Sequence, residues 1–329
     1  MYAPELAKIG HAALVTPDLE ASHHFVHDLL GLDEVERRDG TVYYRAWGEF
    51  EHHSLSLREG PVGVDHLAWR TRRPEDVDAF AGRLEAAGVE VDRVEAGEEA
   101  GQGTAIRFTT AGGHPFEIYH DIEKPAAPEA IRSRLLNQPA TAHRRGASPR
   151  RIDHYNLATA VDNVGSAQAF LSEQLGLKTR EYVAPKDGPL IAAWMSVTSN
   201  VHDTAIVADM ANPADHGRLH HVAYYFESFQ DVYRAADIFR EEGLTLDAGP
   251  GIHGIGRAMF CYLKDPGSGH RFELYSGGYQ IFDPDWEPLH WTEDEIVDGM
   301  VWTGERFVPG GGGPMDGTTP CASASPAAA

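Results

Sequence analysis

The chain has only two cysteines among its 329 residues, Cys261 and Cys321. Cys261 lies in an apolar run that is typical of a buried strand, and Cys321 lies in a terminal stretch of Gly, Pro, Ser and Ala. A disulfide between two such positions is not expected, and a chain without disulfides fits a reducing compartment. We therefore expect free thiols and a cytoplasmic location.

Long apolar runs are also missing. No run approaches the roughly 18 residues that a membrane-spanning helix needs, and the N-terminal MYAPELAKIGH lacks the basic and apolar regions of a secretion signal. The chain is 42% hydrophobic and 24% charged, which is typical of a globular protein. We expect no membrane association, and the length suggests two domains.

Positive charge is scarce. Lys and Arg total 28 against 50 for Asp and Glu, which gives a net charge of −22. Because phosphate contacts need clustered Lys and Arg, we expect no nucleic-acid partner. Histidine, in contrast, is plentiful, with 18 residues, and several stand where strands are expected to begin.

Four segments of the chain share one layout. Each has a histidine near its start, a short strand-like run, a polar break with Asp or Glu, and an amphipathic helical pattern that ends in Gly. The segments begin at Gly10, Val64, Asp153 and Leu219, and short β-like runs follow each of them. This repetition predicts an α+β fold of four β-α-β-β-β modules, paired into two tandem domains.

Two stretches break the pattern. Residues 125–150 are rich in Pro, Ala and Arg, and residues 309–329 consist largely of Gly, Pro, Ser and Ala. We therefore expect an N-terminal domain over 1–124, a connection over 125–150 and a C-terminal domain over 151–308. The composition of 309–329 cannot bury a core and predicts a disordered tail.

Three potential metal ligands occupy matched positions in the second half. His154 and His221 open the first strands of the third and fourth modules, and Glu273 lies on the last strand. One such histidine is more often a surface or core residue, but three at matched positions favour a metal site. Two His and one carboxylate leave three cis positions open, as expected for non-haem Fe(II) oxygenases.

The first half carries the same set, His11, His66 and Glu117, with nearly the same spacing. Ligand count alone therefore does not identify the working site. The second half has further polar groups around its set, namely Asn156, His202, His253 and Tyr262.

The first half offers fewer such groups. Ala13 is the expected counterpart of Asn156, Phe108 that of Tyr262, and the turn AGEEAGQG has no histidine. His52 or His53 is the expected counterpart of His202. Because a metal without acid–base partners does little chemistry, we place the working site in the second domain and expect no functional metal in the first.

Motifs in both halves resemble one enzyme family. VYYRAW and HSLSLRE in the first half, and DHYN, GRLHHVAYYFES, GPGIHG and YLKDPGSGHRFELYSGGY in the second, resemble the type I extradiol ring-cleaving dioxygenases of the vicinal oxygen chelate superfamily. The resemblance covers about residues 8–308 and is strongest to the catechol 2,3-dioxygenase (metapyrocatechase) group. It implies the glyoxalase-like version of the predicted fold.

The resemblance also implies site roles. His154, His221 and Glu273 would bind Fe(II), with Mn(II) compatible with the same ligands. His202 would be the acid–base residue, His253 and Tyr262 would contact the substrate oxygens, and Trp194 and Asn156 would line the pocket. The implied reaction is cleavage of a catechol by O₂ to a 2-hydroxymuconic semialdehyde, and the implied assembly is a homotetramer.

The sequence departs from the family pattern in four places. Cys261 stands where the family has an aliphatic residue or Phe, and GSG (267–269) is a turn insertion before Glu273. Ala248 stands where carboxylate-recognising relatives carry Arg, and their paired C-terminal arginines are missing. These last differences argue against homoprotocatechuate and favour catechol or an alkyl- or halo-substituted catechol.

Two rival functions remain open at this point. One is a glyoxalase-like isomerase or epimerase that uses Zn, Ni or Mn, but such sites commonly supply a fourth protein ligand, which the facing strands do not offer. The other is a non-enzymatic binding protein of the bleomycin-sequestering type, which needs no metal triad.

Overall fold

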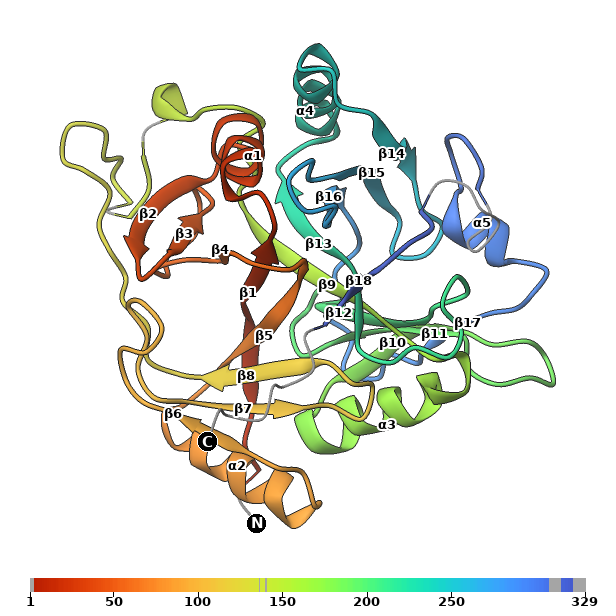
Figure 1. The fold of residues 1–329 in the computed structure, drawn as a ribbon. Coiled ribbons are helices and arrows are strands. Elements are labelled where there is room, and N and C mark those ends of the chain that lie inside the picture. The colour runs from red at the N-terminus through yellow and green to blue at the C-terminus, as the bar shows by residue number, and fades with distance from the viewer. Residues whose placement is uncertain (1–2, 136, 140, 308–314, 322–329) are drawn as a thin grey trace.

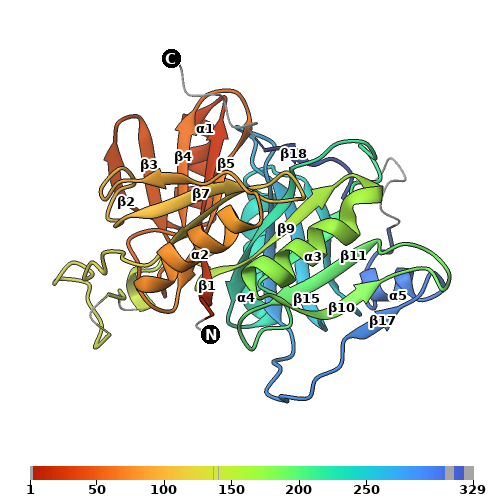
Figure 2. The same cartoon turned by 90° about the horizontal axis from the view of Figure 1, so that it is seen from below.

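Two mixed β-sheets dominate the computed structural model, which describes residues 3–135, 137–139, 141–307 and 315–321 (Figures 1 and 2). The first sheet has the strand order β2-β3-β4-β1-β5-β8-β7-β6. Its strands are β1 (Leu6–Thr16), β2 (Asp33–Arg38), β3 (Thr41–Arg45), β4 (Leu55–Glu59), β5 (Gly63–Thr71), β6 (Asp92–Val94), β7 (Ala105–Thr109) and β8 (Pro115–Tyr119).

The second sheet repeats this plan in the order β14-β15-β16-β13-β9-β12-β11-β10-β17, and β18 pairs with β13. Its strands are β9 (Arg151–Thr159), β10 (Lys178–Val183), β11 (Ala192–Ser196), β12 (Thr204–Ala208), β13 (Arg218–Phe226), β14 (Leu246–Ile252), β15 (Ala258–Lys264), β16 (Arg271–Gly277), β17 (Leu289–Trp291) and β18 (Thr319–Pro320).

One helical segment follows the first strand of each module, so the predicted β-α-β-β-β order and α+β fold are confirmed. These segments are α1 (Leu19–His23) with η1 (His24–Leu29), α2 (Glu75–Ala86), α3 (Val164–Leu175) and α4 (Phe229–Glu241). The remaining short helices are η2 (Thr141–His143), η3 (Val161–Asn163) and α5 (Ile296–Met300).

The helices begin and end at the residues expected from their chemistry. The Asp18 side chain accepts a hydrogen bond from the Ala21 backbone N–H at 3.0 Å, and Ser228 accepts one from Asp231 at 3.2 Å. Each satisfies a backbone donor that the first helical turn leaves free. Gly176 ends α3 at φ 78°, a left-handed conformation that favours glycine.

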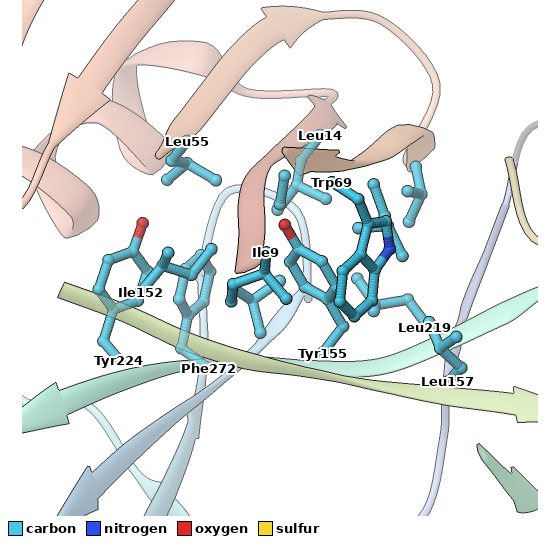
Figure 3. Packing of buried hydrophobic residues seen from close by; sticks show 14 of the residues in the cluster. Ile9, Leu14, Leu55, Trp69, Ile152, Tyr155, Leu157, Leu219, Tyr224 and Phe272 are labelled. Carbon is cyan, nitrogen blue, oxygen red and sulfur yellow. The ribbon is translucent and has the colours of Figure 1, made fainter. Parts of the chain in front are cut away.

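The central strands β1, β5, β9 and β13 carry the core between the two sheets. Figure 3 shows side chains of β9 and β13 pointing toward side chains of β1 and β5. The rings of Trp69 and Tyr155 meet edge to face with centroids 6.2 Å apart. The Tyr155 hydroxyl donates to the backbone carbonyl of His11 at 2.8 Å and lies 3.2 Å from that of Ala68. Each sheet is therefore packed on the other through a buried hydrogen bond as well as apolar contact.

Helices also pair across the two halves. The rings of Phe25 in η1 and Phe239 in α4 lie 5.5 Å apart, and Arg83 of α2 donates to the Gln174 carbonyl of α3 at 3.2 Å. Figure 1 shows α1 beside α4 at one end and α2 near α3 at the other. The first module thus packs on the fourth, and the second on the third.

Two buried histidines join the sheets in equivalent ways. Nε2 of His114, just before β8, donates to the Ala158 carbonyl of β9 at 2.9 Å, and Nε2 of His270, just before β16, donates to the Val15 carbonyl of β1 at 3.0 Å. Burial lowers the pKa of His114 to about 4, so its imidazole is neutral at pH 7. His270 is thus a structural residue that links the second sheet to the first.

The terminal segment differs from the sequence expectation of disorder over 309–329. Residues 309–314 and 322–329 lie outside the described residues, but 315–321 pack on the second sheet. β18 pairs with Arg218 and Leu219, the part of β13 that β16 does not cover. Buried Arg271 donates to the Gly317 carbonyl at 2.8 Å. Backbone carbonyls that accept from Arg271, pairing with an open strand edge and the buried side chain of Met315 together hold this segment in place.

Residues 125–150 contain only the short helix η2 as a regular element in their described part. They are nevertheless anchored, since Asn137 and Gln138 donate to the carbonyls of Glu49 and Gly48 at 2.6 and 3.0 Å. No helix in the described ranges is long and apolar enough to cross a membrane.

The Tyr155 hydroxyl generates a stability prediction. Tyr155→Phe leaves buried carbonyl acceptors on β1 and β5 without a donor, so we expect unfolding free energy to fall by about 1–3 kcal/mol. The control is Tyr233→Phe, because Tyr233 is 58% exposed on α4. Urea unfolding followed by tryptophan fluorescence measures both, and equal midpoints for the two variants would contradict the assignment.

Candidate active site

His154, His221 and Glu273 meet on three adjacent strands, β9, β13 and β16. Nε2 of His154 lies 3.2 Å from Nε2 of His221, and the two nitrogens lie 2.9 and 3.1 Å from Oε2 of Glu273. A cation with bonds of about 2.1 Å at right angles places neighbouring donor atoms about 3 Å apart. The three donors therefore form one triangular face of an octahedral site and leave the opposite face free.

The strand register explains why these residues meet. Ala223 of β13 lies opposite both His154 of β9 and Glu273 of β16. Its methyl group leaves room above β13 for the two longer side chains. His221, two residues earlier on β13, points to the same face because strand side chains alternate.

Two further side chains hold the histidine ligands from behind. Oδ2 of Asp153 lies 2.9 Å from Nδ1 of His154, and Nδ1 of His220 lies 2.7 Å from Nδ1 of His221. Such contacts fix the ring orientation and direct Nε2 toward a metal. A bulge in β13 between Leu219 and His221 brings the two rings together. In an unbroken strand the alternation of side chains would put His220 on the opposite face from His221, and the bulge is why it does not.

The electrostatics of the triad suit a cation. Burial lowers the pKa of His221 to about 4, which leaves a neutral imidazole at pH 7. Burial alone would raise the pKa of Glu273, but His221 and His154 hold it well below its ordinary value. Burial would lower the pKa of His154, but its hydrogen bonds to Asp153 and Glu273 raise it to about 9, so a bound cation would take the place of a proton on this ring.

The remaining predicted residues surround the triad. The rings of His202 and His154 lie 4.1 Å apart, and Nε2 of His253 lies 3.0 Å from the Tyr262 hydroxyl and 3.6 Å from Oε1 of Glu273. Burial, with His154 beside it, holds the pKa of His202 well below its ordinary value. Burial and Glu273 raise the pKa of Tyr262 far above its usual range, so the phenol stays protonated.

Several polar atoms in the site have no hydrogen-bond partner among the described residues. They are Oε1 of Glu273, Nδ1 of His202 and Oδ1 of Asn156. Buried polar atoms without partners are costly, so their convergence on one point favours a bound group there. The donor set of two nitrogens and one carboxylate fits a divalent first-row metal.

A cavity of about 40 Å³ lies against these atoms. Trp194 lines it as the resemblance implies, and Ile255, Gly299 and Met300 close its apolar side. The lining contains no Lys or Arg.

The structure thus brings together every site residue expected from the sequence, and the GSG insertion (267–269) is absorbed in a turn where Gly267 N–H bonds to Asp265. Asp153 and His220 were missed, although an acid or a second histidine directly beside a ligand is a readable signal. Ile255, Gly299 and Met300 were also missed, since an apolar residue in a loop carries no signal of its own.

The first sheet brings His11, His66 and Glu117 together as well, with Glu99 as a fourth member. The expected match between Phe108 and Tyr262 is wrong by one residue. Arg107 lies opposite Glu117, whereas Tyr262 lies opposite Glu273. His53 is the counterpart of His202, because its ring lies 4.4 Å from that of His11, as the ring of His202 lies 4.1 Å from that of His154.

Comparisons with known families agree with this geometry. Residues 64–123 match the catechol 2,3-dioxygenase-like N-terminal domain, and residues 151–274 match the glyoxalase/bleomycin resistance protein/dioxygenase superfamily.

Similar proteins match both halves together. The chain is 52% identical to a manganese-dependent 2,3-dihydroxybiphenyl 1,2-dioxygenase of Geobacillus genomosp. 3, over 96% of this chain and 99% of the relative. It is 32% identical to a metapyrocatechase of Geobacillus stearothermophilus, over 92% and 91%.

Solved structures show the same fold. The 2,3-dioxygenase LapB of Pseudomonas sp. KL28 superposes with a TM-score of 0.80 at 32% identity, over 88% of this chain and 99% of LapB. An extradiol ring-cleaving dioxygenase of B. fuscum gives a TM-score of 0.82 at 30% identity, over 93% and 81%. On these matches and its site geometry, the chain belongs to the extradiol ring-cleaving dioxygenases of the vicinal oxygen chelate superfamily and is a metal-dependent enzyme of that family.

Proposed function

We propose that this dioxygenase opens the ring of a neutral, apolar-substituted catechol beside its two hydroxyls. Both atoms of O₂ enter the product, a 2-hydroxymuconic semialdehyde or its substituted form. The observation that carries the proposal is the convergence of an open-faced His154–His221–Glu273 triad, neutral His202 and the Tyr262–His253 pair on one cavity whose lining has no Lys or Arg.

The proposed metal ligands are His154, His221 and Glu273. A divalent cation held there supplies a Lewis acid that lowers the pKa of the catechol hydroxyls and binds the diol. Fe(II), which the sequence resemblance implies, suits these ligands, and so does Mn(II). The dependence on manganese of the 52% identical relative supports Mn(II) for this chain.

His202 is the proposed acid–base residue. Its imidazole is buried and neutral, and its Nδ1 has no partner in the described part of the chain. A neutral imidazole accepts a proton from a substrate hydroxyl and returns it later in the reaction. Asn156, whose Oδ1 is also without a partner, lies opposite His221 and lines the same cavity.

Tyr262 and His253 are proposed to hold the substrate oxygen. The phenol of Tyr262 keeps its proton and donates hydrogen bonds, and His253 lies 3.0 Å from it. Nδ1 of His253 bonds to the Met300 carbonyl, which fixes the ring. Donors held in place in this way stabilise negative charge that develops on a ring oxygen without rearranging.

Trp194, Ile255 and Met300 are proposed to set the substrate class. They form the apolar side of a cavity that has no Lys or Arg, so a substrate carboxylate would be buried without a partner. Ala248 is nine-tenths buried beside Tyr262, where it offers no charge either. An alkyl, halo or aryl substituent fits these contacts.

Metal removal tests the proposed function. We expect protein stripped by a chelator to lose oxygen uptake and the yellow ring-opened product, and anaerobic Mn(II) or Fe(II) loading to restore both. Product absorbance with 2,3-dihydroxybiphenyl, 3-methylcatechol and catechol measures the recovery. Failure of every metal with every one of these catechols would overturn the proposal.

His202→Asn tests the acid–base role. We expect kcat to fall about 10²–10⁴-fold because the proton acceptor is lost. Metal content and anaerobic catechol binding should stay as in the parent protein, since the triad is intact. The control is His24→Asn, an exposed histidine of η1. An unchanged kcat in His202→Asn would reject the assignment.

A comparison of two substrates tests whether the pocket lacks a cationic side chain. We expect kcat/KM for 3,4-dihydroxyphenylacetate to be at least about 10²-fold below that for 3-methylcatechol, because burying an unpaired carboxylate costs several kcal/mol. The two substrates are assayed under identical metal loading. Equal values would show that a cation reaches the pocket during turnover.

A further inference from the structure

The first sheet holds a buried cluster that the proposed reaction does not use. His11 of β1, His66 of β5 and Glu117 of β8 meet there, together with Glu99 from the turn before β7. All four are at least nine-tenths buried. Nε2 of His11 lies 2.9 Å from Nε2 of His66, a contact in which one nitrogen has to be protonated or both have to face a cation.

This cluster repeats the catalytic triad by position. His66 lies opposite Ala13 as His221 lies opposite Asn156, and Glu117 lies next to Ala68 as Glu273 lies next to Ala223. The small Ala68 gives the flanking side chains the same space. Three donors are therefore arranged as in the active site, on strands that are adjacent in the same order.

The fourth donor is what differs. Oε1 of Glu99 lies 3.7 Å from Nε2 of His11, and Oε2 lies 3.4 Å from Nε2 of His66, while the nearest Glu117 oxygens lie 3.8 and 3.7 Å from these nitrogens. A tetrahedral cation with bonds of about 2.0–2.1 Å spaces its donors by about 3.3 Å. The carboxylate oxygens lie slightly farther than this from the nitrogens, and the two nitrogens, 2.9 Å apart, lie slightly closer together. Small shifts of the side chains would therefore give a closed, four-coordinate site.

The hydrogen bonds of the two carboxylates, and a buried histidine nitrogen without a partner, also bear on whether the cluster binds a cation. Arg107 pairs with both carboxylates, with its Nε 2.7 Å from Oε2 of Glu117 and its Nη2 3.0 Å from Oε2 of Glu99. Gln102 donates to Oε1 of Glu117 at 2.7 Å, so Oε1 of Glu99 is the carboxylate oxygen of the cluster that Arg107 and Gln102 leave open to a cation. Nε2 of His53 is buried, makes no hydrogen bond among the described residues and lies 3.4 Å from Oε1 of Glu99.

We propose that His11, His66, Glu99 and Glu117 bind a second divalent cation, of the zinc type, as a closed structural site in the first domain. With four protein ligands the site has no open position for a substrate, which agrees with the expectation that this domain holds no functional, catalytic metal. The cation would tie the turn of residues 95–103 to three central strands of the first sheet. Access is through a cavity of about 180 Å³ that touches His66, Glu99 and Arg107.

Metal counting tests the proposal in the full-length protein. Chelator-treated protein is loaded with Co²⁺, passed over a desalting column and analysed for metal per chain. We expect about two equivalents and the intense visible absorption of tetrahedral Co²⁺, because the active-site triad is not tetrahedral. One equivalent without this absorption would overturn the proposal and mean that Arg107 and a proton on the histidines balance the cluster.

Variants assign the two equivalents. Glu99→Gln keeps the shape of the side chain but weakens a ligand, so we expect about one equivalent and loss of the tetrahedral absorption. His221→Ala should also bind about one equivalent yet keep that absorption. The matched control is Glu98→Gln, the exposed neighbour, which should behave as the parent protein. A tetrahedral absorption that persists in Glu99→Gln would reject the assignment.

Thermal stability gives a second readout that does not depend on turnover. A cation that binds only the folded chain raises the unfolding temperature. In the His221→Ala background, Zn²⁺ should raise the Tm, and in His221→Ala with Glu99→Gln it should not. Equal Tm shifts in both would place the ion elsewhere, whatever the outcome of the ring-cleavage assays.

Discussion

The structure depends on four central strands that are buried on both faces. Along β9, His154 and Asn156 face the active-site cavity, whereas Tyr155 and Leu157 between and after them face the other sheet (Figure 3). A register slip of one residue would put the metal ligand into the core and the tyrosine into the site. Because both faces are specified, the packing of the sheets fixes the position of the ligands as tightly as any contact within the site.

This constraint also couples the two halves. The Tyr155 hydroxyl bonds to the backbone carbonyl of His11, so the strand that carries one cluster holds the strand that carries the other. His114 and His270 add the same kind of link at two symmetric places. The two sheets are therefore held to each other by buried hydrogen bonds at three places.

The sequence was sufficient where the repeat carried the information. Four copies of one pattern predicted the modules. Alignment of their histidines predicted His154 and His221, and the carboxylate on the last strand predicted Glu273. It was insufficient where register decided the outcome, because Phe108 and Arg107 are neighbours that point to opposite faces and no pattern in a five-residue strand separates them. It also failed for residues 315–321, whose hold on the sheet depends on buried Arg271 and a strand edge that only the folded chain reveals.

The catalytic triad and the first-sheet cluster differ mainly at two places. One is the residue opposite the carboxylate ligand, and the other is the turn that carries Glu99. Opposite the carboxylate ligand the second domain has Tyr262, which is neutral, and the first has Arg107, which is permanently charged. A phenol is a neutral donor that a substrate oxygen could accept from, whereas the guanidinium of Arg107 is held by Glu117 and Glu99. Glu99 then closes the remaining side. The same duplicated strands thus carry a triad beside a neutral phenol in one half and a four-residue cluster paired with an arginine in the other.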